Sequence, residues 1–140
     1  MANIMILEDE QYLRRLYTEE LEREGHQVIV VGQGSEALRI LQQIPIDLVI
    51  LDLVVGGDDG LDWLQKMMVL RRDLKVVINT AYPEFRQDFR CWGADRFVIK
   101  SSDLSALKAT VKELLEAPLC TARIAISQQP RSNLLLHPPA

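Results

Sequence analysis

Cysteine and histidine are scarce in this chain. Its 140 residues include two cysteines, Cys91 and Cys120, and two histidines, His26 and His137. The cysteines form no Cys-x-x-Cys pair, so we expect free thiols in the cytosol and no disulfide framework. Neither histidine has a ligand partner at metal spacing, and we expect both to be ordinary surface residues.

Long apolar runs are also absent. No uncharged apolar run approaches the ~20 residues that cross a bilayer. The first apolar run, Ile4–Leu7, is short and is followed by three acidic residues, which does not fit a secretory signal. We therefore expect no membrane segment and a cytoplasmic location.

Basic residues are too few and too dispersed for nucleic-acid binding. Residues 1–117 hold all 20 acidic residues and 14 of the 16 lysines and arginines, which gives this part a net charge of −6. Contacts to nucleic-acid phosphates need clustered Lys and Arg. Direct nucleic-acid binding is therefore not expected.

The composition changes near Pro118. The last 23 residues, 118–140, contain four of the six prolines and no acidic residue, and no helical or strand periodicity continues there. We expect one domain over residues 1–117 and a tail or linker stub over 118–140. The sequence shows no recognisable effector domain.

Short apolar runs alternate with helical patterns five times. The runs are Asn3–Leu7, Val28–Val31, Leu48–Leu51, Val76–Ile78 and Phe97–Ile99. Each is followed by apolar residues at helical spacing, and the fourth of these patterns, Phe85, Phe89 and Trp92, predicts a helix that ends near Gly93 and packs on the core. The runs are continuously apolar, as in strands covered on both faces. The pattern predicts an α/β fold with a doubly wound, five-stranded parallel sheet and helices on both faces.

Chemically useful side chains follow four of the five strands. Glu8 and Asp9 follow the first, Asp52 the third, Thr80 ends the fourth region and Lys100 follows the fifth. In doubly wound sheets the carboxyl ends of the strands form the ligand site. Carboxylates gathered there repel one another unless a cation offsets them, and Mg²⁺ is the hard cation suited to carboxylates and phosphate. The sequence thus predicts a phosphoryl-transfer site with Asp52 as nucleophile and Lys100 as a second positive charge.

Four segments resemble the response-regulator receiver domains of two-component phosphorelays. They are Leu7-Glu8-Asp9-Glu10, Leu51-Asp52 through Gly60, Asn79-Thr80-Ala81-Tyr82, and Gly93 through Lys100. The resemblance covers about residues 3–116 and implies a flavodoxin-like sheet with strand order 2-1-3-4-5.

The resemblance also implies roles for individual residues. Asp52 would be the phosphoacceptor, with Thr80 and Lys100 binding the phosphoryl group. Glu8, Asp9, Asp52 and the carbonyl of Val54 would hold Mg²⁺, and Thr80 would draw Phe97 inward as a switch. The implied partners are a sensor histidine kinase or phosphotransfer protein and an unknown effector. The surface of the fourth helix, fifth strand and fifth helix is the implied site of homodimerisation.

The chain departs from the family at three positions. Ser101 follows Lys100 where proline is usual, so we expect a trans peptide bond, since a cis bond costs ~2.5–4 kcal/mol before a residue other than proline. Gly56 stands where proline is common, and we expect a looser loop after Asp52. Val54, two residues after the acceptor, cannot orient a hydrolytic water.

Three alternative functions remain open. Gly32-x-Gly34-x-x-Ala37 matches the dinucleotide fingerprint and follows a strand, although the second strand is not its usual place. An aspartate-nucleophile phosphatase would carry a second acid at Val54. A receiver-like scaffold that binds partners without phosphorylation would not need all the site residues.

Overall fold

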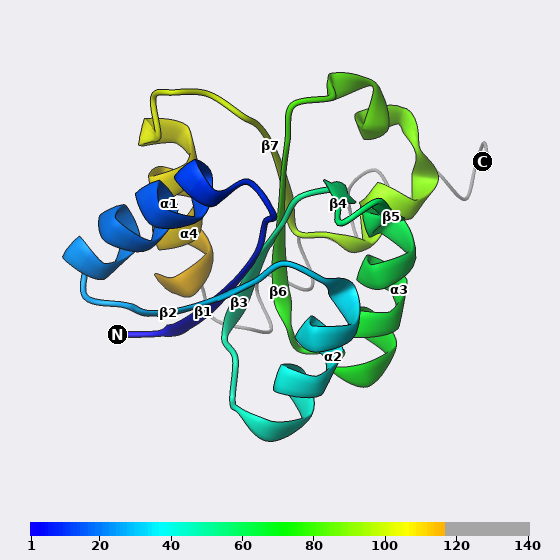
Figure 1. Cartoon of the computed structure of the whole chain (residues 1–140), viewed down its shortest axis with the longest axis horizontal. Coiled ribbons are helices and arrows are strands. Elements are labelled where there is room, and N and C mark those ends of the chain that lie inside the picture. Colours follow the sequence, from blue (N-terminus) through cyan, green and yellow to red (C-terminus); the bar gives the residue numbers. More distant parts are fainter. Residues whose placement is uncertain (117–140) are drawn as a thin grey trace.

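The computed structural model describes residues 1–116 (Figure 1). At its centre is a five-stranded sheet in which all neighbouring strands are parallel, in the order β2-β1-β3-β6-β7. The strands are β1 (Asn3–Leu7), β2 (Gln27–Val31), β3 (Leu48–Leu51), β6 (Lys75–Thr80) and β7 (Arg96–Ile99). The fold class and the strand order predicted from the sequence are confirmed.

Helices cover both faces of the sheet, as the continuously apolar strands predicted. In Figure 1, α1 and α4 lie on one side and α2 and α3 on the other. The helices are α1 (Gln11–Arg23), α2 (Gly34–Gln43), α3 (Gly60–Leu70) and α4 (Ser105–Glu116). The two resulting cores share the strands, because alternate residues of a strand point to opposite faces. Ile4 and Ile6 belong to the core under α1 and α4, whereas Met5 and Leu7 belong to the other.

A small hairpin follows the third strand of the main sheet. Its strands, β4 (Val54–Val55) and β5 (Asp58–Asp59), are antiparallel. Gly56 and Gly57 connect them with φ angles of +60° and +80°. Two positive φ angles in a two-residue turn are typical of a type I′ hairpin. The loop that we expected to be loose is therefore an ordered hairpin.

The predicted helix through Phe85, Phe89 and Trp92 is wrong. The segment forms two 3₁₀ turns, η1 (Pro83–Gln87) and η2 (Phe89–Gly93). Asp88 lies between them in an extended conformation, and its carboxylate accepts a hydrogen bond from the N–H of Arg90. A short polar side chain that binds nearby backbone competes with a continuous helix. Phe89 is 63% exposed, so only the other two aromatic residues pack against the core.

Two smaller expectations can be compared with the described residues. The Lys100–Ser101 peptide bond is trans, as expected. His26, which we expected at the surface, is half-buried, and its Nδ1 accepts a hydrogen bond from the backbone N–H of Ala2 at 3.2 Å.

None of the helices within residues 1–116 is long and apolar enough to cross a membrane. The tail predicted over 118–140, with Cys120 and His137, lies outside the described residues, and the boundary at 117 stays a prediction.

Candidate functional site

The ends of β1 and β3 place two carboxylates side by side. Leu7 pairs with Leu51 in the parallel ladder, so the next residues, Glu8 and Asp52, lie at the same level. The ladder continues through them, because the N–H of Asp52 donates to the carbonyl of Leu7 at 3.1 Å. Both residues are buried, with exposed fractions of 1% and 6%. Two neighbouring carboxylates that are buried away from water need a positively charged partner to stay ionised.

Lys100 supplies that positive charge. Its backbone N–H donates to the carbonyl of Thr80 at 2.8 Å, which extends the β6–β7 ladder by one residue. Its ammonium lies 2.8 Å from Oε1 of Glu8 and 2.9 Å from Oδ2 of Asp52. The predicted convergence of these three side chains from separate strand ends is therefore present.

The protonation of this cluster follows from burial and pairing. Burial raises the pKa of Glu8, and the hydrogen bond from Lys100 only partly opposes this rise. Burial lowers the pKa of Lys100, but its hydrogen bonds to Asp52 and Glu8 act in the other direction, and the net change is upward. The lysine therefore stays charged near neutral pH.

Asp9 completes a group of three carboxylates. It is exposed, and its Oδ2 accepts a hydrogen bond from the N–H of Gly56 at 2.9 Å, which ties the end of β1 to the hairpin. One oxygen atom from each of Glu8, Asp9 and Asp52 lies within 4.8 Å of the other two. Hard oxygen donors at this spacing fit Mg²⁺, which binds through a few carboxylates and keeps coordination positions for water or phosphate.

Val54 bonds to this group, and Thr80 ends the neighbouring strand β6. The N–H of Val54 donates to Oδ1 of Asp52 at 3.2 Å, and the valine side chain is largely exposed. Thr80 is fully buried, and its hydroxyl accepts a hydrogen bond from the N–H of Tyr82 at 3.3 Å. That bond is long, and the hydroxyl, which accepts in it, can donate its own proton to another oxygen.

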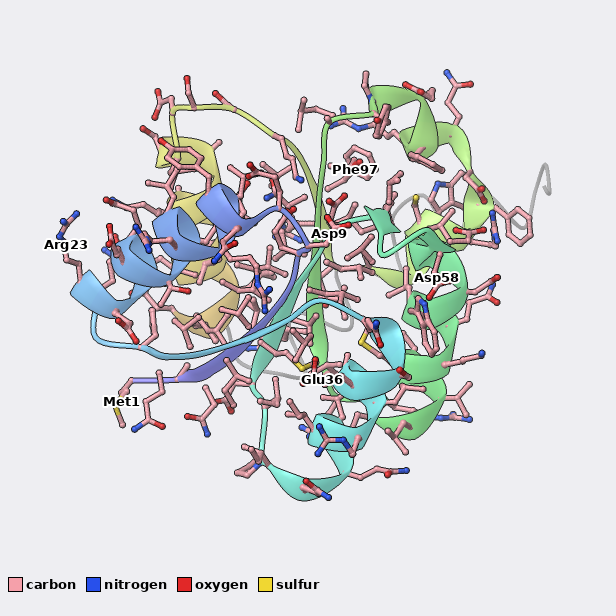
Figure 2. The ribbon with its side chains drawn as sticks, in the orientation of Figure 1. Met1, Asp9, Arg23, Glu36, Asp58 and Phe97 are labelled. Atoms are coloured by element: carbon pink, nitrogen blue, oxygen red, sulfur yellow. The ribbon has the colours of Figure 1, made fainter. Side chains whose placement is uncertain are left out.

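Phe97 is half-buried on β7. The guanidinium of Arg86, from η1, lies 4.8 Å from the centre of its ring. Figure 2 shows Asp9 near the middle of the view and Phe97 above it. In the β6–β7 ladder Phe97 pairs with Ile78, two residues before Thr80, and one face of its ring is covered by a cation.

Gly60 has a part in the site that the sequence patterns did not reveal. A Cβ atom at Gly60 would lie 2.6 Å from the Cα of Leu53 and 2.8 Å from the carbonyl oxygen of Asp52. Helix α3 can therefore begin directly against the backbone of the candidate acceptor only because this residue has no side chain. The preceding Asp59, which caps the helix at the N–H of Leu61, was the available signal for this helix start.

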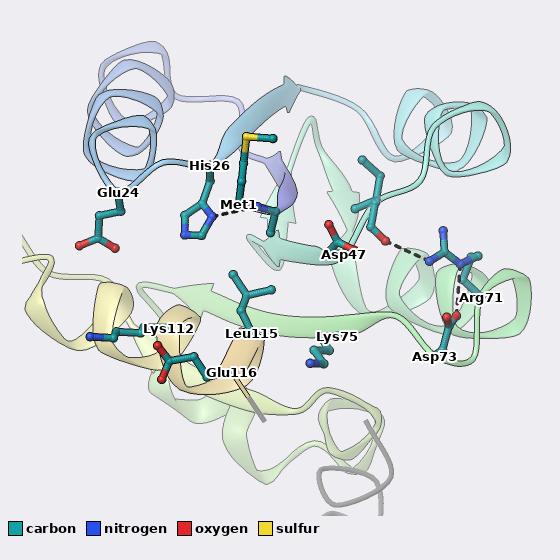
Figure 3. Close-up of a pocket in the computed structure, with 12 residues that line it drawn as sticks. Met1, Glu24, His26, Asp47, Arg71, Asp73, Lys75, Lys112, Leu115 and Glu116 are labelled. Atoms are coloured by element: carbon teal, nitrogen blue, oxygen red, sulfur yellow. Dashed lines mark hydrogen bonds and ion pairs between the residues drawn. The ribbon is translucent and has the colours of Figure 1, made fainter. Parts of the chain in front are cut away.

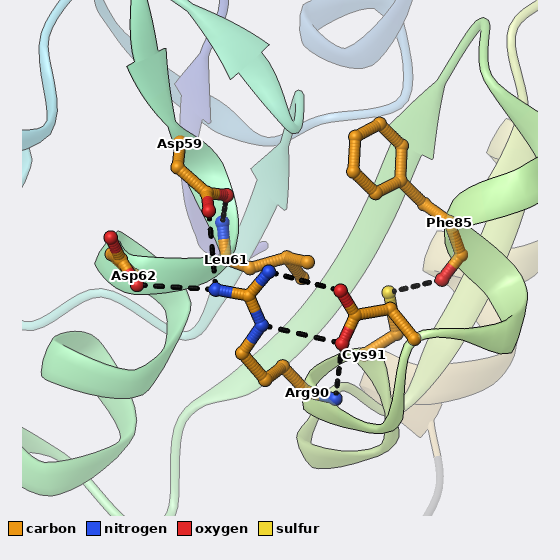
Figure 4. Close-up of polar contacts among 7 residues, drawn as sticks. Asp59, Leu61, Asp62, Phe85, Arg90 and Cys91 are labelled. Atoms are coloured by element: carbon orange, nitrogen blue, oxygen red, sulfur yellow. Dashed lines mark hydrogen bonds and ion pairs between the residues drawn. The ribbon is translucent and has the colours of Figure 1, made fainter.

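Arg90 connects η2 to the same region. Its guanidinium contacts Asp88 at 2.9 Å, Asp59 at 3.1 Å and Asp62 at 3.3 Å (Figure 4). The hydrogen bond to Asp88 is the largest cause of the raised pKa of Arg90. Asp59 and Asp62 thus hold η2 against the start of α3 through Arg90, and Asp88 orients the guanidinium from its own side.

One glycine of the dinucleotide-like motif, Gly34, has a packing explanation. A Cβ atom at Gly34 would lie 2.0 Å from the indole ring of Trp63, so this glycine allows α2 and α3 to pack closely. Ala37 is fully buried in the same core. Packing therefore accounts for Gly34 and Ala37 without a nucleotide, whereas no close contact explains Gly32.

A pocket of about 670 Å³ lies at the other edge of the sheet (Figure 3). Its lining includes Ala2, His26, Asp47 and Lys75, which stand at or before the amino ends of the strands. None of the carboxylates or the lysine of the candidate site lines it. The pocket and the candidate site therefore lie at opposite ends of the strands.

Known proteins of similar sequence share this arrangement of elements. Residues 4–112 match the family described as the response regulator receiver domain. Sporulation initiation phosphotransferase F of Bacillus subtilis (strain 168) is 33% identical over 114 residues, which are 80% of this chain and 92% of that protein. The alginate biosynthesis transcriptional regulatory protein AlgB of Pseudomonas aeruginosa is 32% identical over 125 residues, which are 88% of this chain but 28% of that protein.

Solved structures give the same result. The response regulator protein TrrA of Thermotoga maritima, in complex with Mg²⁺-BeF, has a TM-score of 0.78 and 37% identity, over 81% of this chain and 99% of that one. TrrA in complex with the histidine kinase ThkA gives a TM-score of 0.77 and 37% identity, over 83% of this chain and 100% of that chain. The chain belongs to the response regulator receiver domain family.

Proposed function

We propose that this domain accepts a phosphoryl group on Asp52 from the phosphohistidine of a sensor histidine kinase or phosphotransfer protein. The observation that carries the proposal is the Lys100 ammonium, held 2.8 Å from Glu8 and 2.9 Å from Asp52 at the end of the buried strands. Phosphoryl transfer depends mainly on positioning and on neutralising charge, and these contacts supply both. The domain is a signalling module whose own catalysis is limited to its phosphorylation and dephosphorylation.

Asp52 is the nucleophile in this proposal. A carboxylate oxygen forms a bond to phosphorus while the phosphorus–nitrogen bond of the donor breaks, and the electron pair leaves with the histidine nitrogen. The N–H of Val54 and the ammonium of Lys100 hold the two oxygens of Asp52 at 3.2 Å and 2.9 Å, which fixes the carboxylate plane. The same ammonium neutralises an oxygen of the incoming phosphoryl group.

Mg²⁺ is the proposed cofactor. Glu8, Asp9, Asp52 and the carbonyl of Val54 would hold it, and the spacing of the three carboxylates supports this assignment. When bound, the ion offsets the negative charge that the carboxylates and the phosphoryl group bring together. The N–H of Gly56 orients the Asp9 carboxylate from the hairpin side.

Thr80 and Phe97 are the proposed switch. The Thr80 hydroxyl would leave the N–H of Tyr82 and donate to a phosphoryl oxygen, and Phe97 would move into the space left beside it. A ligand shifts such an equilibrium only through its different affinity for the two states. Here the difference is one charge-assisted hydrogen bond, which exists only when Asp52 is phosphorylated.

The proposed partners are a kinase and an unknown effector. The TrrA–ThkA complex supports a histidine kinase, and the transcriptional regulators among the relatives support an output domain, since this chain spans about a third of their length. The exposed Phe89 and Ile99 support a homodimer through the surface of η1, η2, β7 and α4. The net negative charge argues against direct nucleic-acid binding. The cytoplasm is the proposed compartment, consistent with the buried free thiol of Cys91.

Intact-mass measurement with acetyl phosphate tests the proposal. The unmodified chain should gain one phosphoryl group only when Mg²⁺ is present, and Asp52→Asn should gain none. Asp58→Asn is the matched control, because it removes an exposed carboxylate of the adjacent hairpin and should leave labelling unchanged. Labelling of Asp52→Asn at the rate of the unmodified chain would refute the assignment.

A further inference from the structure

A polar pair is buried beneath the site. The side-chain amide of Asn79 donates a hydrogen bond to the hydroxyl of Tyr17 at 3.0 Å. Their exposed fractions are 2% and 1%, and Tyr17 belongs to the core that apolar residues of α1, α4 and the sheet form. A half-satisfied polar group in such a core is costly, whereas an apolar pair of the same shape is not. Burial and stability alone therefore give no reason for polar residues at these two positions.

The register places Asn79 in the row of the catalytic carboxylates. Leu51 pairs with Ile78, so Asn79 lies at the level of Asp52, which itself lies at the level of Glu8. Alternation along the strands puts all three on the face covered by α1 and α4, because Ile6, Ile50 and Val77, two residues earlier, belong to that core. Asn79 is thus the third member of the row.

Lys100 has to cross this row to reach its partners. It follows β7, whereas Asp52 and Glu8 follow β3 and β1, and β6 lies between them. The side chain of Lys100 is on the same face as Asn79, since Val98 packs against the core under α1 and α4. A lysine side chain is flexible, and its ammonium is fixed only by its surroundings.

The Tyr17 hydroxyl is close enough to the site to feel its charges. Burial is the main cause of the raised pKa of Tyr17, and the charges of Lys100, Glu8 and Asp52 also act on it. The hydrogen bond between the amide and the hydroxyl fixes the orientation of both groups beside the row of carboxylates.

We propose that Tyr17 and Asn79 are positioning residues that hold the Lys100 ammonium between Glu8 and Asp52 for phosphoryl transfer. This inference rests on the proposed function of Asp52. The pair does not contact the phosphoryl group. Its role is to provide two polar groups of fixed orientation near the lysine side chain.

A double variant separates this role from a structural one. Tyr17→Phe or Asn79→Leu alone leaves an unpaired polar group and should destabilise the domain, whereas Tyr17→Phe/Asn79→Leu removes both groups and should recover most of the stability. Phosphorylation of Asp52 by acetyl phosphate should not recover with it. We expect a rate roughly 10- to 100-fold below that of the unmodified chain, the cost typical of a misplaced catalytic group. Thr18→Val, which removes the neighbouring hydroxyl that bonds to the Arg14 carbonyl, is the control and should keep the full rate.

The same substitutions in a Lys100→Ala background test whether the pair acts through the lysine. There the double substitution should have no further effect on the rate or on the affinity for beryllofluoride with Mg²⁺. An equal loss with and without Lys100, or a double variant that reacts at the full rate, would overturn the inference. If the double variant does not fold, Tyr17→Phe, which deletes one oxygen atom, takes its place in both backgrounds. Failure of the unmodified chain to label on Asp52 would instead refute the proposed function.

Discussion

Replacing Lys100 with methionine should expose how strongly the site depends on one positive charge. Methionine keeps the unbranched side chain but removes the ammonium that lies 2.8 Å from Glu8 and 2.9 Å from Asp52. The side chains of these two acids are only 2% and 7% exposed, so water cannot replace the lost partner. Removal of one partner from a buried ion pair costs about 3–5 kcal/mol. The lower end applies here, because the Lys100 side chain is 17% exposed.

Urea denaturation at neutral pH, with and without Mg²⁺, measures this cost. Without the ion, Lys100→Met should lower the free energy of unfolding by about 3 kcal/mol. With Mg²⁺ at about 100 times its dissociation constant, binding to the folded state adds about 2.7 kcal/mol to the variant, which should bring it close to the stability of the unmodified chain measured without the ion. The variant should also bind Mg²⁺ more tightly than the unmodified chain, because no ammonium repels the ion.

A second substitution provides the control. In Lys100→Met/Asp52→Asn one of the two uncompensated charges is gone, so part of the stability should return without Mg²⁺. Equal stability of Lys100→Met and the unmodified chain without the ion would refute the reasoning, because it would mean that the buried carboxylates need no counter-charge.

Three further outcomes follow from other parts of the structure. Gly60→Ala should destabilise the domain by about 1–3 kcal/mol in thermal or urea unfolding, because a Cβ atom there would meet the backbone of Leu53. Gly93→Ala is the control, since no atom lies within 4 Å of the added carbon. Equal effects of the two substitutions would contradict the close approach at Gly60. Burial raises the pKa of the Cys91 thiol to about 12, so it should resist iodoacetamide at pH 8 until the domain is unfolded, and rapid native alkylation in a Cys120→Ser background would count against this. Thr80→Ala should still accept phosphate on Asp52 yet show little change in the NMR signals of Phe97, and full changes there would disprove the coupling.

Much of the candidate site could be predicted because strand ends are ordered by simple rules. A parallel sheet brings the carboxyl ends of its strands to one edge, so Glu8, Asp52 and Lys100 had to meet once their strands were recognised. The hairpin could also have been predicted, because Gly56-Gly57 between Val54-Val55 and Asp58-Asp59 is a sequence signal for a type I′ turn. We expected a loose loop because Gly56 alone is conformationally flexible. Two adjacent glycines, however, favour a specific two-residue turn.

The features that escaped prediction depend on contacts between segments far apart in the chain. The spacing of Phe85, Phe89 and Trp92 is helical, but the Asp88 carboxylate accepts a hydrogen bond from the Arg90 N–H and so competes with a continuous helix. Arg90 then fastens the second turn to Asp59 and Asp62, about thirty residues earlier in the chain, through ion pairs that no periodicity encodes. A regular helix over this segment would rotate Arg90 relative to those acids. The irregular backbone and the ion pairs therefore support each other, which makes this segment a product of tertiary contacts more than of local propensity.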